Sequence, residues 1–171
     1  MTATSKESDF ASTLRKRMRG NLVILGVGNA SRSDDAAGPC LVEMLRERLK
    51  TLGEPRPSVH LINGREAPEN YIGQIVRRKP DTVVVLDCAS VGLVPGEVRI
   101  VELDEPSGNN PSTHGIPPIL LMSRLKEETG ADVFMVAIQP ATTAFGEGVS
   151  APVGQALAGL ASLIESIFRG K

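Results

Sequence analysis

The sequence predicts a single-domain α/β fold, a three-layer sandwich in which helices cover both faces of a mostly parallel five-stranded sheet. Strand-like and helix-like segments alternate along most of the 171 residues, an order typical of right-handed βαβ units and a parallel sheet. Residues 22–25 (LVIL) are apolar without alternation, as expected of a parallel strand that is buried on both faces. The length suits one domain with a substantial core and is short for two.

The chain is organised around its opening strand–turn–helix unit. After the strand at 22–25, residues 26–29 (GVGN) predict a glycine turn, and a polar loop carrying Asp34 and Asp35 follows. Pro39 suits the first turn of a helix, which completes the unit. Since ligands of open α/β folds bind at the carboxyl ends of the strands, this acidic loop is a candidate site.

The acidic loop also has two other interpretations. A dinucleotide-binding fingerprint would need a further glycine where Ser31 and Arg32 stand, and two carboxylates would repel a pyrophosphate, so nucleotide binding is the least favoured. Alternatively, Ser33 or Asp34 caps the following helix, because a helix N-terminus favours acceptors and negative charge. On this stretch alone, capping and a metal-binding or acid–base role are equally open.

The remaining elements follow from hydrophobic periodicity and from turn residues. Prolines and glycines mark the ends of the helices. The connection after the third strand is short and lacks a helix, so we expect the fourth strand to be antiparallel at an edge of the sheet. In chain order we expect a helix at 41–49, a strand at 59–63, a helix at 67–79, strands at 82–86 and 97–103, a helix at 119–128, a strand at 132–138 and a helix at 151–168.

Composition excludes several classes of function. A formal net charge of −1 and few aromatic residues argue against nucleic-acid binding, and no apolar run is long enough to suggest a membrane span. The only cysteines, Cys40 and Cys88, form neither a zinc-type pair nor a disulfide framework. Residues 1–20 lack the apolar centre of a secretion signal. We therefore expect a poorly ordered leader at 1–20, one domain at 21–171 and a cytoplasmic location.

Three potential metal ligands fall near one edge of the predicted sheet. Asp35 follows the first strand, Asp87 follows the third, and His114 lies in the long loop at 104–118. If the strand order reverses between strands one and three, the two aspartates meet, and their repulsion favours a bound divalent cation. One imidazole and two carboxylates with open positions suit nickel, iron, manganese or zinc. The alternatives are a turn residue for Asp87 and an ordinary loop histidine for His114.

Further polar residues adjoin these positions. Cys88 offers a thiolate, although a buried cysteine is more often a small apolar residue. Asn63 and Gln139 end strands and are interpreted as supporting groups of the cleft. There is no GxSxG elbow and no recognisable Cys–His nucleophile setting, so a covalent acyl-enzyme route has no clear candidate.

Five motifs, LGVGNASRSDDAAGP, NGREAPEN, VVVLDCASVGLVPGEVRI, STHGIP and VAIQP, follow one another within residues 21–168. In this order and spacing they resemble the [NiFe]-hydrogenase maturation endopeptidases, most of all the branch that processes the large subunit of formate-hydrogenlyase-type hydrogenase. The resemblance implies a cytoplasmic protease that removes the C-terminal extension of a nickel-loaded large-subunit precursor. It also implies that Asp35, Asp87 and His114 form the catalytic site and recognise nickel carried by the substrate, a site that other divalent metals can also occupy.

The chain departs from the family pattern at two positions. Where the family usually reads GDDGxG, this chain has Ala36 after the acidic pair, and where it reads DGG, this chain has Asn63 followed by Gly64 and Arg65. Alanine is less suited than glycine to a positive φ. Because Asn63 lacks the carboxylate of the family pattern, Asn63→Asp is expected to raise the processing rate or to shift its pH dependence. The expected reaction is peptide-bond hydrolysis. The alternative is a non-catalytic nickel-sensing or hydrogenase-binding protein on the same scaffold.

Overall fold

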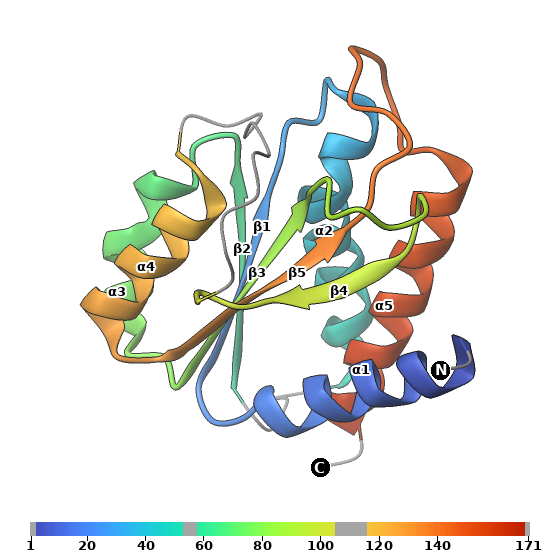
Figure 1. Ribbon diagram of the computed structural model, residues 1–171. Coiled ribbons are helices and arrows are strands. Elements are labelled where there is room, and N and C mark those ends of the chain that lie inside the picture. Colours follow the sequence, from blue (N-terminus) through green and yellow to red (C-terminus); the bar gives the residue numbers. More distant parts are fainter. Residues whose placement is uncertain (1–2, 53–57, 105–115, 170–171) are drawn as a thin grey trace.

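The computed structural model describes residues 3–52, 58–104 and 116–169, in which five strands form one sheet between layers of helices (Figure 1). The strand order is β2-β1-β3-β5-β4, with four parallel strands and β4 antiparallel at one edge. This arrangement confirms the predicted fold class and the antiparallel edge strand. The strands are β1 (Leu22–Val27), β2 (Val59–Arg65), β3 (Thr82–Cys88), β4 (Val98–Val101) and β5 (Asp132–Ile138).

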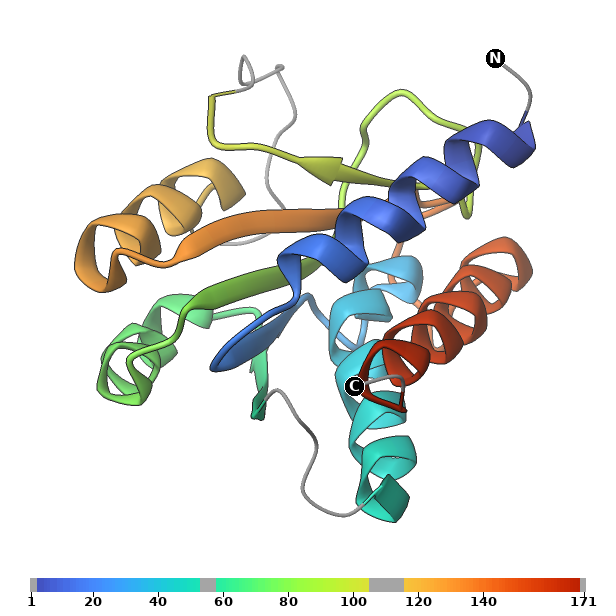
Figure 2. The same ribbon diagram turned by 90° about the horizontal axis from the view of Figure 1, so that it is seen from below.

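Helices cover both faces of the sheet, as the view from below shows (Figure 2). Helices α1, α2 and α5 pack on one face, and α3 and α4 pack on the other. The α-helices are α1 (Ala3–Arg17), α2 (Ala37–Leu49), α3 (Ile72–Arg78), α4 (Pro118–Thr129) and α5 (Ala151–Arg169). Short 3₁₀ helices are η1 (Ser33–Ala36), η2 (Lys50–Leu52) and η3 (Pro68–Tyr71).

The central strands bury alternate side chains in two separate cores, because both faces of the sheet are covered. In β1, Leu22 and Ile24 belong to the core beneath α1, α2 and α5, whereas Val23 and Leu25 belong to the core beneath α3 and α4. Every residue of β1 and β3 is buried, which explains why their sequences do not alternate. These strands form a rigid base for the loops that follow them.

The prediction of a poorly ordered leader at 1–20 is wrong for the part that the structure describes, which contains helix α1. Leu14 and Met18 are fully buried, and together with Phe10 they place an apolar residue at every fourth position, on one face of the helix. The charged residues between them obscured this spacing in the sequence. Arg17 adds a polar anchor, because its Nε and Nη2 donate hydrogen bonds to the two carboxylate oxygens of Asp132 at 2.9 and 2.6 Å.

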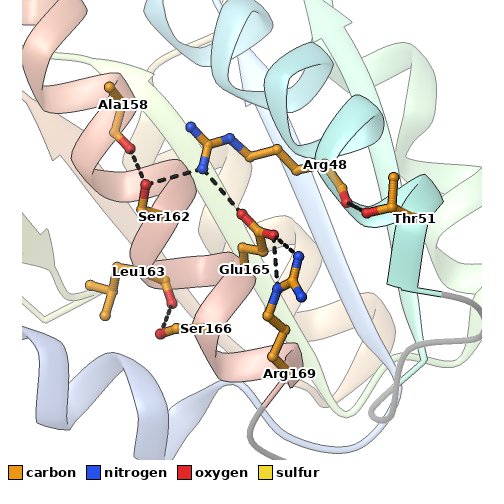
Figure 3. Close-up of polar contacts among 8 residues, drawn as sticks. All are labelled: Arg48, Thr51, Ala158, Ser162, Leu163, Glu165, Ser166 and Arg169. Carbon is orange, nitrogen blue, oxygen red and sulfur yellow. Dashed lines mark hydrogen bonds and ion pairs between the residues drawn. The ribbon is translucent and has the colours of Figure 1, made fainter.

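Helix α5 is long and apolar enough, by length and composition alone, to cross a membrane, contrary to the expectation that no apolar run is long enough to suggest a span. In the fold its apolar side is buried in the core that it shares with α2. Polar contacts join the same two helices, since Arg48 of α2 donates hydrogen bonds to Ser162 at 3.0 Å and Glu165 at 3.1 Å (Figure 3). Glu165 also pairs with Arg169 (Figure 3). The Arg48 contacts join the polar side of α5 to α2.

The element boundaries differ from the predictions mainly at the ends. Helix α2 begins at Ala37 rather than at residue 41, and β2 continues to Arg65, beyond the predicted end at residue 63. The predicted helix at 67–79 is divided into η3 and α3, and it ends at Lys79 in a left-handed conformation with a φ of 49°. The fifth strand has the predicted bounds.

Candidate functional site

Asp35 and Asp87 lie at the carboxyl edge of the sheet, where the strand order reverses. From β1 the chain crosses to β2 on one side, and it then returns to β3 on the other side of β1. Strands β1 and β3 are parallel neighbours, with Gly26 opposite Leu86, and η1, which carries Asp35, contacts β3. The aspartates are almost completely buried, with 0% of Asp35 and 2% of Asp87 exposed. The structure therefore places two buried acidic side chains at the switch point of the sheet.

Two glycines allow η1 and the first turn of α2 to pack directly on the strand ends. Gly28 has a φ of 144°, and a Cβ at this position would lie 1.8 Å from the carbonyl oxygen of Asp35. A Cβ at Gly38 would lie 2.3 Å from carbonyl oxygens of β1 and β3. Only glycine permits such close approaches. They hold Asp35 beside the glycine turn, where its Oδ2 accepts a hydrogen bond from the backbone N–H of Asn29 at 3.1 Å.

Ala36 fits this turn without strain. Its φ is −71° and its ψ −6°, so the positive φ that would favour glycine does not occur at this residue. The left-handed residue of the turn is Ser33, with a φ of 44°. The expectation that Ala36 disturbs the acidic turn is therefore wrong.

Asp34 points away from the β1 turn and binds the loop at 139–150. Its Oδ2 accepts hydrogen bonds from the backbone N–H groups of Ala141 at 2.8 Å and Thr142 at 3.1 Å. The backbone N–H of Ser150 donates to Oδ1 at 2.6 Å, and the Ser150 hydroxyl donates to Oδ2 at 2.9 Å. Asp34 thus fastens η1 to the loop that precedes α5.

The hydrogen bonds to Asp34 also determine its charge. Burial raises the pKa of the Asp34 carboxyl, but the bonds from Ser150, Thr142 and Ala141 outweigh burial and hold this pKa below its usual value. Neither Ser33 nor Asp34 caps a helix, because no side-chain cap bond forms at η1 or α2. The two adjacent acids have separate surroundings, and the sequence contained no signal for the Asp34–Ser150 contact across more than one hundred residues.

Gln139 supports the loop that follows Asp87. The side chain is 8% exposed, and its Oε1 accepts hydrogen bonds from the backbone N–H groups of Val91 at 2.9 Å and Leu93 at 3.2 Å. A buried carbonyl oxygen that binds two backbone donors fixes the path of a loop. Gln139 is therefore a supporting residue at the edge that carries Asp87.

Asn63 contacts helix α2. Its Nδ2 donates a hydrogen bond to Oε1 of Glu43 at 3.1 Å, while its Oδ1 is buried and accepts no hydrogen bond from the described residues. An amide at position 63 therefore suits this contact. It donates a hydrogen bond to Glu43, whereas a carboxylate at position 63 would repel the Glu43 carboxylate.

Cys88 is a neutral thiol beside Asp87. Burial raises the pKa of the Cys88 thiol above its usual value, and the carboxylates of Asp87, Asp34 and Asp35 raise it further. The thiolate is the reactive form of cysteine, so this position does not supply a nucleophile.

His114, the third predicted ligand, lies outside the described residues, so its position relative to Asp35 and Asp87 is not part of the fold described above. Among the residues that the structure does describe, no group of three or more His, Cys, Asp and Glu side chains could hold a metal ion. The described part of the site contributes two carboxylates, which are suitable ligands for a divalent cation.

Comparison with known proteins identifies the family. A sequence model described as hydrogenase maturation protease (HycI) matches residues 42–167. The hydrogenase 3 maturation protease of Escherichia coli is 35% identical over 136 residues, which cover 79% of this chain and 83% of that protein.

Solved structures agree with the sequence comparison. The crystal structure of a [NiFe] hydrogenase maturation protease HycI from Thermococcus kodakarensis superimposes with a TM-score of 0.81 at 35% identity, covering 92% of this chain and 99% of that one. The solution structure of the endopeptidase HycI from Escherichia coli gives a TM-score of 0.70 at 32% identity, covering 85% and 90% of the two chains. The chain described here belongs to the hydrogenase maturation protease family and is a peptidase with a role in hydrogenase maturation.

Proposed function

We propose that this peptidase removes the C-terminal extension of the nickel-loaded large-subunit precursor of a [NiFe] hydrogenase, and that it does so in the cytoplasm. Membership of the family supports a hydrogenase precursor as the substrate. The observation that carries the proposal is the pair of buried carboxylates, Asp35 and Asp87, at the carboxyl edge of the sheet.

A cation is the natural ligand of this pair. Two carboxylates in one buried site repel each other, and a divalent ion removes that repulsion. In the proposal the ion is the nickel of the precursor, which Asp35, Asp87 and His114 recognise. The protease then acts only on a subunit that has received its metal.

Hydrolysis of the peptide bond requires water to attack the scissile carbonyl carbon and a proton to reach the leaving amine. The neutral Cys88 thiol is unsuited to a covalent route. A metal ion can position the substrate and polarise a carbonyl or activate water. The carboxylates that hold the ion would fix this geometry, and a carboxylate in the site can also accept a proton.

The test is incubation of the purified protein with nickel-loaded and nickel-free precursor, followed by mass measurement of the large subunit. We expect a truncated C-terminus and a released peptide only from the nickel-loaded precursor. Asp87→Asn and Asp35→Asn should each abolish most of this cleavage, with unfolding curves measured in parallel to separate loss of activity from loss of fold. Equal cleavage of both precursor forms, or full activity of Asp87→Asn, would contradict the proposal.

A further inference from the structure

Three exposed apolar side chains lie in segments at the carboxyl edge of the sheet, the edge that also carries the two site aspartates. The large apolar residues that the described part of the chain leaves exposed are Val94, Leu120 and Phe145, at 65%, 56% and 80%. Val94 lies between β3 and the antiparallel β4, Leu120 in the first turn of α4, and Phe145 in the loop after β5. The segments of Val94 and Phe145 follow β3 and β5, which end at the carboxyl edge. Helix α4, whose first turn holds Leu120, begins at this edge because its other end leads into the start of β5. All three residues therefore lie at the carboxyl edge.

Phe145 is accompanied by a cation. The guanidinium carbon of Arg32 lies 4.9 Å from the centroid of the Phe145 ring. Arg32 is half-buried, and its Nε is buried without a hydrogen-bond partner among the described residues. A buried guanidinium N–H that lacks a hydrogen-bond partner costs free energy, and stacking on an aromatic ring offsets only part of that cost.

Backbone hydrogen bonds fix this pair relative to Asp35. The backbone N–H of Ser33 donates a hydrogen bond to the carbonyl oxygen of Gly146 at 2.9 Å. The backbone N–H of Gly146 donates one to the carbonyl oxygen of Ser31 at 3.0 Å. Figure 1 shows the two loops side by side, after β1 and before α5. The N–H of Asp35 in turn donates to the carbonyl oxygen of Arg32 at 3.0 Å. Arg32 and Phe145 therefore occupy a defined position beside the site.

We propose, resting on the function proposed above, that Arg32 and Phe145 anchor the large-subunit precursor. Arg32 pairs with a carboxylate of the precursor near the cleavage point, and Phe145 contacts an apolar side chain beside that carboxylate. An exposed aromatic ring and an arginine are the residue types that dominate binding energy at protein interfaces. The occupant is thus an acidic and apolar segment of the precursor, selected by charge as well as by its metal.

The experiment measures binding and cleavage of purified nickel-loaded precursor by the wild type, Arg32→Gln and Phe145→Ala. Both variants should raise Kd and KM by about tenfold, the scale of an interface anchor, with kcat nearly unchanged because neither residue touches the reacting atoms. Phe145→Tyr retains the ring and should bind like the wild type. Lys50→Gln, which removes an exposed positive charge at the opposite end of α2, is the matched charge control.

Two further readouts separate docking from a merely structural role. The effect of Arg32→Gln should shrink at high ionic strength, because salt screens an ion pair at the rim of an interface. A precursor in which acidic residues near the cleavage point are replaced by their amides should bind the wild type and Arg32→Gln equally. Unchanged Kd and KM in both variants, or loss of kcat at constant KM, would overturn the docking proposal. If the wild type binds the precursor through these residues but never cleaves it, docking stands and the proposed function fails.

Discussion

The Asp34 carboxylate and Ser150 share two hydrogen bonds, one from the backbone N–H at 2.6 Å and one from the hydroxyl at 2.9 Å. Ser150 immediately precedes α5, and Asp34 immediately precedes Asp35, so this contact couples the C-terminal helix to the acidic turn. Together with the bonds from Ala141 and Thr142, it makes Asp34 the residue that positions η1. The two neighbouring acids therefore have different roles. Asp34 fixes the turn, and the turn places Asp35 at the site.

We predict that Asp34→Asn destabilises the protein by about 2–4 kcal/mol, because an amide cannot accept all the bonds that reach the carboxylate and leaves buried donors unpaired. Ser150→Ala removes only the hydroxyl bond and should cost about 1 kcal/mol. Urea unfolding of both variants measures these free energies. An Asp34→Asn variant as stable as the wild type would show that the bonds to the loop at 139–150 contribute nothing.

A second prediction concerns Gln139 and the loop after Asp87. Gln139→Leu deprives the backbone N–H groups of Val91 and Leu93 of their shared acceptor, which should cost about 1–3 kcal/mol and speed amide exchange in residues 89–94. Gln139→Glu keeps an acceptor oxygen and is the matched control, with smaller effects on both measurements. If exchange in this loop is equally slow in Gln139→Leu, the side chain does not hold it.

Much of this architecture could be predicted from the sequence because its strongest signals are local. The apolar runs that became β1 and β3, and the prolines and glycines that end the helices, depend only on near neighbours. The position of Asp35 and Asp87 at the same edge of the sheet followed from topology, since the carboxyl ends of adjacent parallel strands adjoin.

What could not be predicted depends on contacts between distant residues. The bonds from Ser150 to Asp34 and from Arg17 to Asp132 join positions more than one hundred residues apart. Local sequence patterns do not reveal such pairs, so neither the anchor of α1 at Asp132 nor the role of Asp34 could be predicted. The stacking of Arg32 on Phe145 was missed for the same reason.

A third prediction concerns the anchor of α1 at low pH. The hydrogen bond from Arg17, acting against burial, lowers the pKa of Asp132 below its usual value near 3.8. A carboxyl whose pKa is lowered by folding stabilises the folded state above its usual pKa, and that stabilisation is lost as the pH falls through the lowered value. Since Asp132 is partly exposed, we expect Arg17→Gln to cost only about 1 kcal/mol at neutral pH.

The stability difference between Arg17→Gln and the wild type should therefore shrink as the pH falls below about 4, the usual pKa of a free aspartate. Lys16→Gln removes an adjacent exposed charge and should differ little from the wild type at any pH. Urea unfolding of the three proteins from strongly acid to neutral pH provides the comparison. A difference for Arg17→Gln that is constant with pH would show that Asp132 does not carry it.

The contact between Asn63 and Glu43 reverses one expectation from the sequence. An aspartate at position 63 was expected to raise the processing rate by supplying a carboxylate, but in the structure the Asn63 amide donates to Glu43. Asn63→Asp would replace that hydrogen bond with repulsion between two carboxylates, and its buried oxygen would carry charge without a donor. Because Glu43 is half-exposed and also pairs with Arg46 at 3.4 Å, we predict a loss of only about 1 kcal/mol and no gain in processing rate per folded molecule.

The matched test uses Glu43→Gln, alone and combined with Asn63→Asp. In the double variant the amide introduced at position 43 can donate to the new carboxylate, so most of the lost stability should return, and a double-mutant cycle measures the coupling. The loss of stability caused by Asn63→Asp should also become smaller at acid pH. There one of the two carboxylates, at position 43 or 63, binds a proton, and the repulsion between them disappears. If Asn63→Asp is equally destabilising in both backgrounds, the cost does not come from Glu43. A faster rate on nickel-loaded precursor, without loss of stability, would instead restore the expectation drawn from the family pattern.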